Sequence, residues 1–270
     1  MQEHSGRYLS IADFFAQYGI AVLVYDQPGH GKSVSDKKYF GFFQTIDPAA
    51  ILLSGALKMS DLLLQKYPSL PHFILGHSMG SFITRIVLQK SENRFNGAVI
   101  VGTGGRMYLT YFLKKYFSIA NNIAPYSHTV FNALFGFINN WKFRAESDDL
   151  SWLSVNPLNR ESFSQDMFCG IPFTNNGYYA LFSLHTNATK TNWAKNIPKS
   201  LPLLFISGQD DPIGAFGKGV KETVKALRVD GFNDIQMELY TKMRHEILNE
   251  EIRTDILEYI YNWMLSRTKL

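Results

Sequence analysis

The residues best suited to chemistry include a serine flanked by glycines. The pentapeptide G-H-S-M-G occupies positions 76–80, after the apolar run 73–75 and before a helix-length stretch that starts near Gly80. A nucleophilic serine has to project from a tight turn between strand and helix, which closes only when the residues two positions to either side are small. The first amides of the following helix then point at any oxyanion formed there. A glycine-rich turn is the alternative, but the position between strand and helix favours a nucleophilic Ser78.

Ser78 needs partners, because a serine hydroxyl is a weak nucleophile until a histidine takes its proton and a carboxylate orients that histidine. Both residue types follow in the chain, each after an apolar run. The run 203–207 leads into Asp210 and Asp211, and the run 235–240 leads into a loop with His245. Either aspartate suits the carboxylate at this point, and an Asp-Pro turn or an exposed loop histidine is the alternative explanation. The order of serine, aspartate and histidine after three strands favours a catalytic set.

The elements that position these residues follow an alternating pattern. Short β-rich runs alternate with amphipathic helix-length stretches, which is typical of a parallel sheet flanked by helices. Strands are predicted at 20–25, 73–75, 98–101, 203–207 and 235–240, and helices at 7–18, 48–66, 80–90 and around 252–264. The stretch 106–198, rich in Phe, Tyr, Trp and Asn, breaks this pattern. We therefore expect a core built from 1–105 and 199–270, with 106–198 inserted as a cap or lid over the sheet edge.

Composition narrows the class of protein. The 270 residues are 46% hydrophobic, and the single cysteine, Cys169, excludes an internal disulfide framework and suits a reducing compartment. The formal charge of +4 comes from scattered Lys and Arg, so we expect no nucleic-acid partner. No apolar run reaches the roughly 18 residues that span a bilayer, and the amino terminus lacks the pattern of a signal peptide. A soluble cytoplasmic protein is expected, with transient peripheral contact to an anionic membrane surface left open.

Four motifs occur together, at positions 3–8 (E-H-S-G-R-Y), 26–33 (D-Q-P-G-H-G-K-S), 76–80 and 244–250 (R-H-E-I-L-N-E). As a set they resemble the monoacylglycerol lipase and lysophospholipase branch of the α/β-hydrolase superfamily, the serine aminopeptidase S33-like hydrolases. The resemblance covers nearly the whole chain and is weakest in 106–198. It implies an α/β-hydrolase fold and the triad Ser78, Asp211 and His245, because the family's carboxylate falls three residues after a glycine, here Gly208. It also implies that 106–198 is a mobile apolar cap over an acyl pocket, with a rigid packing module as the alternative.

The expected activity is hydrolysis of carboxylic esters of lipids, such as monoacylglycerol or lysophospholipid, through an acyl-enzyme. Neither a metal nor a cofactor is needed for this chemistry. The alternatives are a general carboxylesterase for short esters and a binding protein that keeps the fold without turnover. The substrate head group and the oligomeric state are not readable from these residues.

The chain departs from the family pattern at its start. In the family a strand and a His-Gly pair precede the motif at 3–8, whereas here Met1 stands where the residue after His-Gly belongs. The strand would lie between those at 20–25 and 73–75, and without it two rows of backbone groups would be unpaired. The expected oxyanion donors are the backbone N–H of Met79 and the Met1 position, and removing one such donor costs about 2.7–4 kcal/mol of transition-state stabilisation. We therefore expect a longer natural amino terminus, or weak activity or poor folding of this chain.

Overall fold

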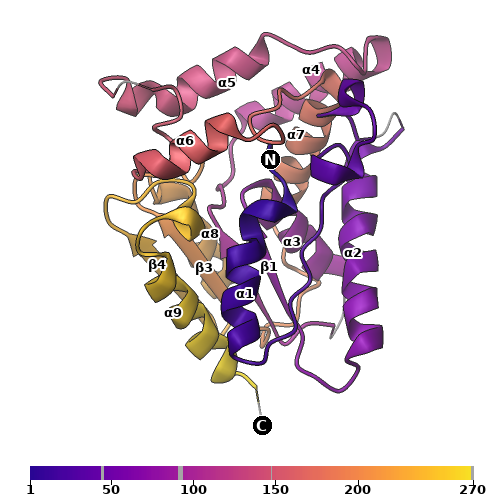
Figure 1. Ribbon diagram of the computed structural model, residues 1–270. Helices are drawn as coiled ribbons and strands as arrows, with labels where there is room; N and C mark the ends of the chain where they lie inside the picture. Colours follow the sequence, from indigo (N-terminus) through magenta and orange to yellow (C-terminus); the bar gives the residue numbers. More distant parts are fainter. Residues whose placement is uncertain (44–45, 91–93, 147, 269–270) are drawn as a thin grey trace.

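A computed structural model describes residues 1–43, 46–90, 94–146 and 148–268. The described residues form a four-stranded parallel sheet in the order β1-β2-β3-β4 (Figure 1). The strands are β1 (Phe73–His77), β2 (Gly97–Val101), β3 (Leu203–Gly208) and β4 (Ile235–Tyr240). Because parallel strands end at one edge, the segments that follow β1, β3 and β4 meet there. Those segments hold Ser78, Asp211 and His245.

Helices cover both faces of the sheet. Along β2, Ala98 and Ile100 pack with α2, α3, α7 and α8, whereas Val99 and Val101 pack with α1 and α9. This period of two is what a strand shows when helices bury it on both faces. The helices of these layers are α1 (Leu9–Gln17), α2 (Pro48–Lys66), α3 (Met79–Lys90), α7 (Asn175–Thr189), α8 (Lys218–Val229) and α9 (Arg253–Leu265), and single 3-10 turns lie at Ser5–Tyr8, Gly31–Ser33, Lys37–Tyr39, Trp141–Phe143 and Ile247–Asn249.

Three further helices lie across the carboxyl edge of the sheet, at the top of Figure 1. They are α4 (Leu109–Ile123), α5 (Phe131–Asn140) and α6 (Pro157–Gln165), and we call them the cap helices. Helix α7, from the same inserted stretch, instead enters the layer beside α3, where its Tyr178 and Leu184 are fully buried. The stretch 106–198 therefore supplies both the cover over the strand ends and part of the packed helical layer.

The strand predicted at 20–25 is wrong. Within the described chain, no backbone group of residues 21–25 bonds to another backbone group, and Val22 is 40% exposed. The reason is the lack of a neighbour. Strand β1 lies on the other side of an open groove and pairs only with β2 in the described sheet. Apolar β-branched residues favour a strand, but a strand forms only where a second backbone bonds to it.

Candidate active site

Ser78 lies at the turn between β1 and α3 with a left-handed backbone, at φ +55°. This conformation is costly outside glycine and persists because the turn is fixed on both sides. The Ser78 N–H donates to the carbonyl of Val101 at 3.0 Å, and the Ser81 N–H donates to the carbonyl of Ser78 at 2.9 Å. A Cβ at Gly76 would lie 2.3 Å from the Gly80 oxygen, so glycine is required there, whereas a Cβ at Gly80 would meet nothing within 4 Å. The structure therefore leaves no room for a side chain at position 76, whereas position 80 has room for at least a methyl group.

Two hydrogen bonds connect Ser78, His245 and Asp211. The Oγ of Ser78 lies 2.8 Å from Nε2 of His245, and Nδ1 of His245 lies 3.0 Å from Oδ2 of Asp211. The fully buried carboxylate also accepts the Ile213 N–H at 2.8 Å and the Ser207 hydroxyl at 3.3 Å. A carboxylate held in this way favours the tautomer with a proton on Nδ1, which leaves Nε2 able to accept the serine proton. The structure thus brings the three predicted residues together.

Asp210, the neighbouring carboxylate, turns away from His245. Its Oδ1 lies 2.7 Å from Nζ of Lys142 in a partly exposed ion pair. The end of β3 and the histidine loop also come into close backbone contact. A Cβ at Gly208 would lie 2.2 Å from the carbonyl oxygens of both Met243 and Arg244, so only glycine lets the end of β3 touch the histidine loop.

The backbone N–H of Met79 is the first of the two predicted oxyanion donors. Met79 is buried and begins α3, and first-turn amides have no partner inside their own helix. Met1, the other predicted donor, lines the same groove as His77 and Met79. Its α-amino nitrogen lies 3.9 Å from Oε1 of Glu3. The oxyanion roles of Met79 and Met1 therefore stay predictions.

His77, which precedes the nucleophile, supports the histidine loop. Its Nε2 donates to the carbonyl oxygen of His245 at 3.0 Å, and its Nδ1 lies 2.9 Å from the hydroxyl of Tyr8. That hydroxyl donates to Glu3 at 2.7 Å, so its oxygen is left to accept from Nδ1, and both ring nitrogens of His77 carry protons. Burial alone would lower the pKa of His77, but the hydrogen bond and negative charge of Glu3 raise it. Burial likewise opposes the charge on Glu3, yet His77 and the Met1 amine hold the pKa of that carboxyl well below its usual range.

The loop before α6 encloses the histidine loop from the other side. The Trp152 ring lies 5.3 Å from the His245 ring between centroids. Arg244, which is buried, donates to the carbonyl oxygens at 151 and 154 and forms an ion pair with Glu146. The N–H of Glu246 donates to the carbonyl oxygen at 153 at 2.7 Å. The position of His245 therefore depends on a part of the chain about ninety residues earlier.

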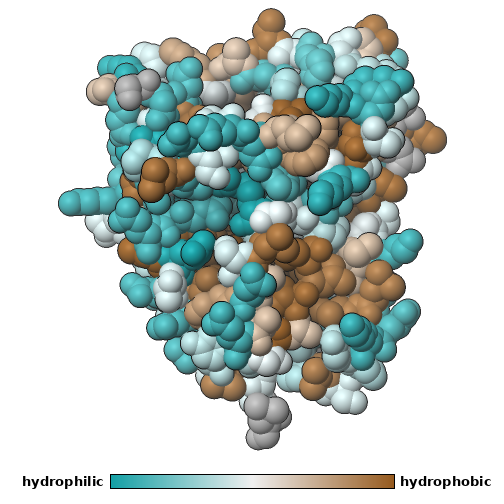
Figure 2. Space-filling model, in the orientation of Figure 1, coloured by the Kyte–Doolittle hydropathy of each residue, from teal (hydrophilic) through white to brown (hydrophobic). Residues whose placement is uncertain are grey.

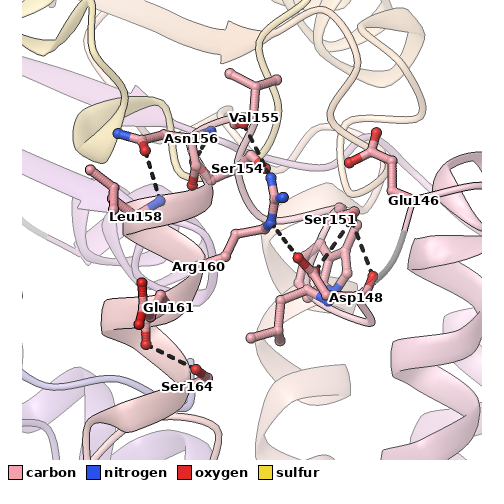
Figure 3. A network of polar contacts seen from close by, with 12 residues as sticks. Glu146, Asp148, Ser151, Ser154, Val155, Asn156, Leu158, Arg160, Glu161 and Ser164 are labelled. Carbon is pink, nitrogen blue, oxygen red and sulfur yellow. Dashed lines mark hydrogen bonds and ion pairs between the residues drawn. The ribbon is translucent and has the colours of Figure 1, made fainter.

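Arg160 of α6 organises that same loop, as Figure 3 shows. Its Nε lies 2.7 Å from Oδ2 of Asp148, and its Nη1 donates to the carbonyl oxygens of Ser154 at 2.8 Å and Val155 at 3.1 Å. The side chain of Asn156 caps α6 by accepting the N–H at 158 at 2.9 Å. The loop that contacts His245 is thus held by hydrogen bonds of its own.

One group of side chains has the residue types of a metal site. His4, Asp166 and Cys169 place one potential ligand atom each within 4.8 Å of one another. However, Nδ1 of His4 accepts the Gly6 N–H at 3.2 Å, so Nε2 carries the proton and donates to Asp166 at 2.8 Å. Burial also raises the pKa of the Cys169 thiol to about 12, which disfavours the thiolate that a metal requires. These contacts are those of a histidine hydrogen-bonded to a carboxylate beside a protonated thiol.

The comparisons with known proteins agree with this geometry. The family model for serine aminopeptidase S33 matches residues 1–252. The chain belongs to this family. Human monoglyceride lipase is 24% identical over 98% of this chain and 80% of its own length. A thermostable carboxyl esterase from Bacillus coagulans, in complex with glycerol, has a TM-score of 0.89 at 26% identity, over 98% of this chain and 87% of that one. A monoglyceride lipase from Saccharomyces cerevisiae has a TM-score of 0.76 at 19% identity, over 100% and 85%.

The S33 assignment confirms the predicted resemblance and the α/β-hydrolase fold. The chain is a hydrolase of the lipase and esterase type. Among the described helices, none has both the length and the apolar character needed to cross a membrane.

Sequence reasoning missed the side chains that support His245. Arg244 stands in the R-H-E motif at 244–246, which was a signal for a role near the histidine, but its partners lie near residue 150. Trp152 carried no local signal at all, because its contact with His245 exists only after the inserted stretch has folded over the strand ends.

Proposed function

We propose that the chain is a serine hydrolase that cleaves carboxylic esters through an acyl-enzyme. The observation that carries the proposal is the hydrogen-bonded series Ser78, His245 and Asp211, at 2.8 and 3.0 Å. His245 takes the proton of Ser78 as its oxygen attacks the ester carbonyl, and Asp211 stabilises the imidazolium. The Met79 N–H stabilises the oxyanion. His245 then protonates the leaving alcohol, and a water activated by the same histidine releases the acid.

The proposed substrates are esters with an acyl chain, monoacylglycerol first and lysophospholipid second. Human and mouse proteins that resemble this chain over nearly its whole length are named monoglyceride lipases. The cap helices support the same choice, because many of their exposed side chains are apolar. Exposed apolar side chains on α4 and α5 and directly beside α5 include Leu109, Phe112, Tyr116, Ile123, Val130, Phe137 and Trp141. We assign to 106–198 the role of a cap over the acyl pocket.

The exposed apolar side chains of the cap helices also support transient contact with a membrane surface. Contiguous exposed apolar patches on a soluble domain mark interaction surfaces. Here aromatic residues, which favour the membrane interface, lie beside Lys114 and Lys115 on α4 and Lys142 and Arg144 after α5. We propose a cytoplasmic protein that takes its substrate from such a surface, and anionic vesicles that recruit the chain more strongly than neutral ones would support this.

Two other functions remain as alternatives. A short-ester carboxylesterase is favoured by the fold likeness to the Bacillus coagulans carboxyl esterase. A binding protein that keeps the fold without turnover is the other, because a fold does not by itself imply catalysis.

The deciding experiment is hydrolysis of p-nitrophenyl esters from C2 to C16, followed by monoolein and lysophosphatidylcholine, with Ser78→Ala beside the unaltered chain. Turnover that peaks at medium or long chains, prefers monoolein and disappears in Ser78→Ala is the expected result. A steady decline from C2 upward would make the chain a short-ester carboxylesterase. Equal background rates in both proteins would favour the binding protein.

A further inference from the structure

The interior of the molecule holds a charged side chain that has no carboxylate beside it. Charged residues ordinarily lie at the surface, as do the hydrophilic side chains spread over the face drawn in Figure 2. Arg85 of α3, by contrast, is 1% exposed. The arginine ion pairs in the described part of the chain do not include it. Burial lowers the pKa of its guanidinium to about 9, so the side chain still carries its charge at neutral pH.

Neutral groups contact this guanidinium. Nη1 of Arg85 donates to the carbonyl oxygen of Gly104 at 3.0 Å and to the hydroxyl oxygen of Thr103 at 3.4 Å. Its Cζ lies 4.3 Å from the centroid of the Trp193 ring. Its Nε is buried without a hydrogen-bond partner among the described residues. A buried cation held by neutral groups alone lowers the free energy of unfolding, because these contacts replace only part of its hydration.

Two hydroxyl groups connect Arg85 to the turn that holds the nucleophile. The Ser81 hydroxyl oxygen lies 2.5 Å from the carbonyl oxygen of Ser78 and 2.8 Å from Oγ1 of Thr103. A carbonyl can only accept, so the single hydroxyl proton of Ser81 bonds to Ser78. Thr103 then donates its own proton to Ser81, and its oxygen accepts from Arg85, which can only donate. We call Arg85, Thr103 and Ser81 the Arg85 network.

The Arg85 network joins the turn of Ser78 to the loop that follows β2. That loop lies against the catalytic histidine, since a Cβ at Gly102 would be 3.3 Å from Cε1 of His245. At the other end, the left-handed backbone of Ser78, at φ +55°, persists only where its surroundings fix it. Arg85 bonds to the loop directly and to the turn through two hydroxyl groups. It therefore contributes to the distance between the two reacting side chains.

We propose that Arg85 is a positioning residue for Ser78, acting through Thr103 and Ser81. The proposal rests on the proposed ester hydrolysis, because it concerns the nucleophile of that reaction. The guanidinium fixes the direction of the two hydroxyl protons and so holds the Ser78 turn beside His245. Because the buried charge lowers stability, an apolar side chain of similar length should stabilise the chain while it loosens the turn.

The test compares Arg85→Met, Thr103→Val and the double variant with the unaltered chain. A displacement of about 1 Å in a catalytic group costs about 10²-fold in rate, and loss of one remote support should move Ser78 less. We therefore expect kcat for p-nitrophenyl butyrate to fall about tenfold in each single variant, with a smaller change in KM. The double variant should lose no more than either single variant, because both act through one network. The Tm of Arg85→Met should equal or exceed that of the unaltered chain.

Arg267→Met is the matched control. The Arg267 guanidinium also lies over a tryptophan, 4.7 Å from the centroid of the Trp263 ring, but it pairs with the partly exposed carboxylate of Asp234. This arginine follows α9 and has no bond to the Ser78 turn. Its replacement should lower the Tm slightly and keep kcat within about twofold, because it removes a surface ion pair.

A second readout does not depend on catalysis. Amide exchange measured by NMR should accelerate at least tenfold at the N–H groups of Ser78 and Ser81 in Arg85→Met and in Thr103→Val, but not in Arg267→Met. Unchanged exchange at these two amides would overturn the proposal. In a chain that turns over ester, an unchanged kcat or additive losses in the double variant would overturn it as well.

Two further results have a defined meaning. If Arg85→Met does not fold, Thr103→Val decides by exchange and kcat, since valine keeps the shape of threonine without its hydroxyl. If the unaltered chain has no ester turnover, the proposed hydrolysis fails, while the exchange rates still show whether Arg85 holds the Ser78 turn.

Discussion

Gly208→Ala tests whether contact between two loops sets the position of His245. The added Cβ would lie 2.2 Å from the carbonyl oxygens of Met243 and Arg244, the two residues before the histidine. Both oxygens are backbone atoms, so the loop has to move by roughly 1 Å to reach ordinary contact, because neither oxygen can rotate aside. A displacement of about 1 Å in a catalytic group costs about 10²-fold in rate, close to 2.7 kcal/mol of barrier. Overpacking should also cost about 1–3 kcal/mol of stability.

The assay is kcat for p-nitrophenyl butyrate at 25 °C, with circular dichroism to show that the variant is folded. We expect kcat to fall about 100-fold with a smaller change in KM, since Gly208 supports the histidine loop. Gly136→Ala in α5 is the matched control, because a Cβ there meets nothing within 4 Å. A folded Gly208→Ala chain that keeps kcat within threefold of the unaltered protein would refute the reasoning.

Three further predictions follow from contacts in and near the site. Gly80→Ala should keep kcat within threefold, as its Cβ enters open space; a 100-fold loss would show that this glycine is needed for another reason. Asp211→Asn should lower kcat about 10⁴-fold. Asp210→Asn loses only the partly exposed ion pair with Lys142 and should keep a kcat near that of the unaltered chain. Equal losses of kcat in the two variants would contradict the assignment of Asp211 as the carboxylate of the triad. The third concerns pH: burial, with the nearby Arg85 charge, lowers the pKa of His185 to about 4. An unfolded histidine titrates near 6.5, so the unfolded chain binds more protons between these values. The free energy of unfolding should then fall as pH drops from 6.5 to 4. In urea titrations, His185→Gln should reduce the dependence of this free energy on pH by up to about 1.4 kcal/mol per pH unit. An unchanged dependence in the variant would contradict the lowered pKa of His185.

The parts of the fold that could be predicted were those coded by local pattern. The helix 48–66 and the strand 235–240 match the structure at both ends, because each combines a clear hydrophobic period with a clear stop signal. The segment 20–25 failed for a non-local reason. Its sequence favours a strand, yet pairing depends on a neighbour that no local pattern can supply.

The site also combines residues that local pattern predicts with contacts that only the folded chain creates. Ser78, Asp211 and His245 could be placed because each follows a strand, and parallel strands bring their carboxyl ends to one edge. The choice of Asp211 over Asp210 came from the family spacing, and the structure agrees with it, because Asp211 bonds to His245 whereas Asp210 pairs with Lys142. The contacts of Arg244 and Trp152 could not be predicted, since they join residues far apart in the chain.

The most direct test of the central proposal is covalent labelling of the intact chain with a fluorophosphonate, read by mass spectrometry of its peptides. Nucleophilic activation by His245 predicts one adduct on the peptide that contains Ser78, no adduct in Ser78→Ala, and labelling slowed by orders of magnitude in Asp211→Asn. An unlabelled chain, or an adduct on any other residue, would contradict the account of Ser78 as the nucleophile.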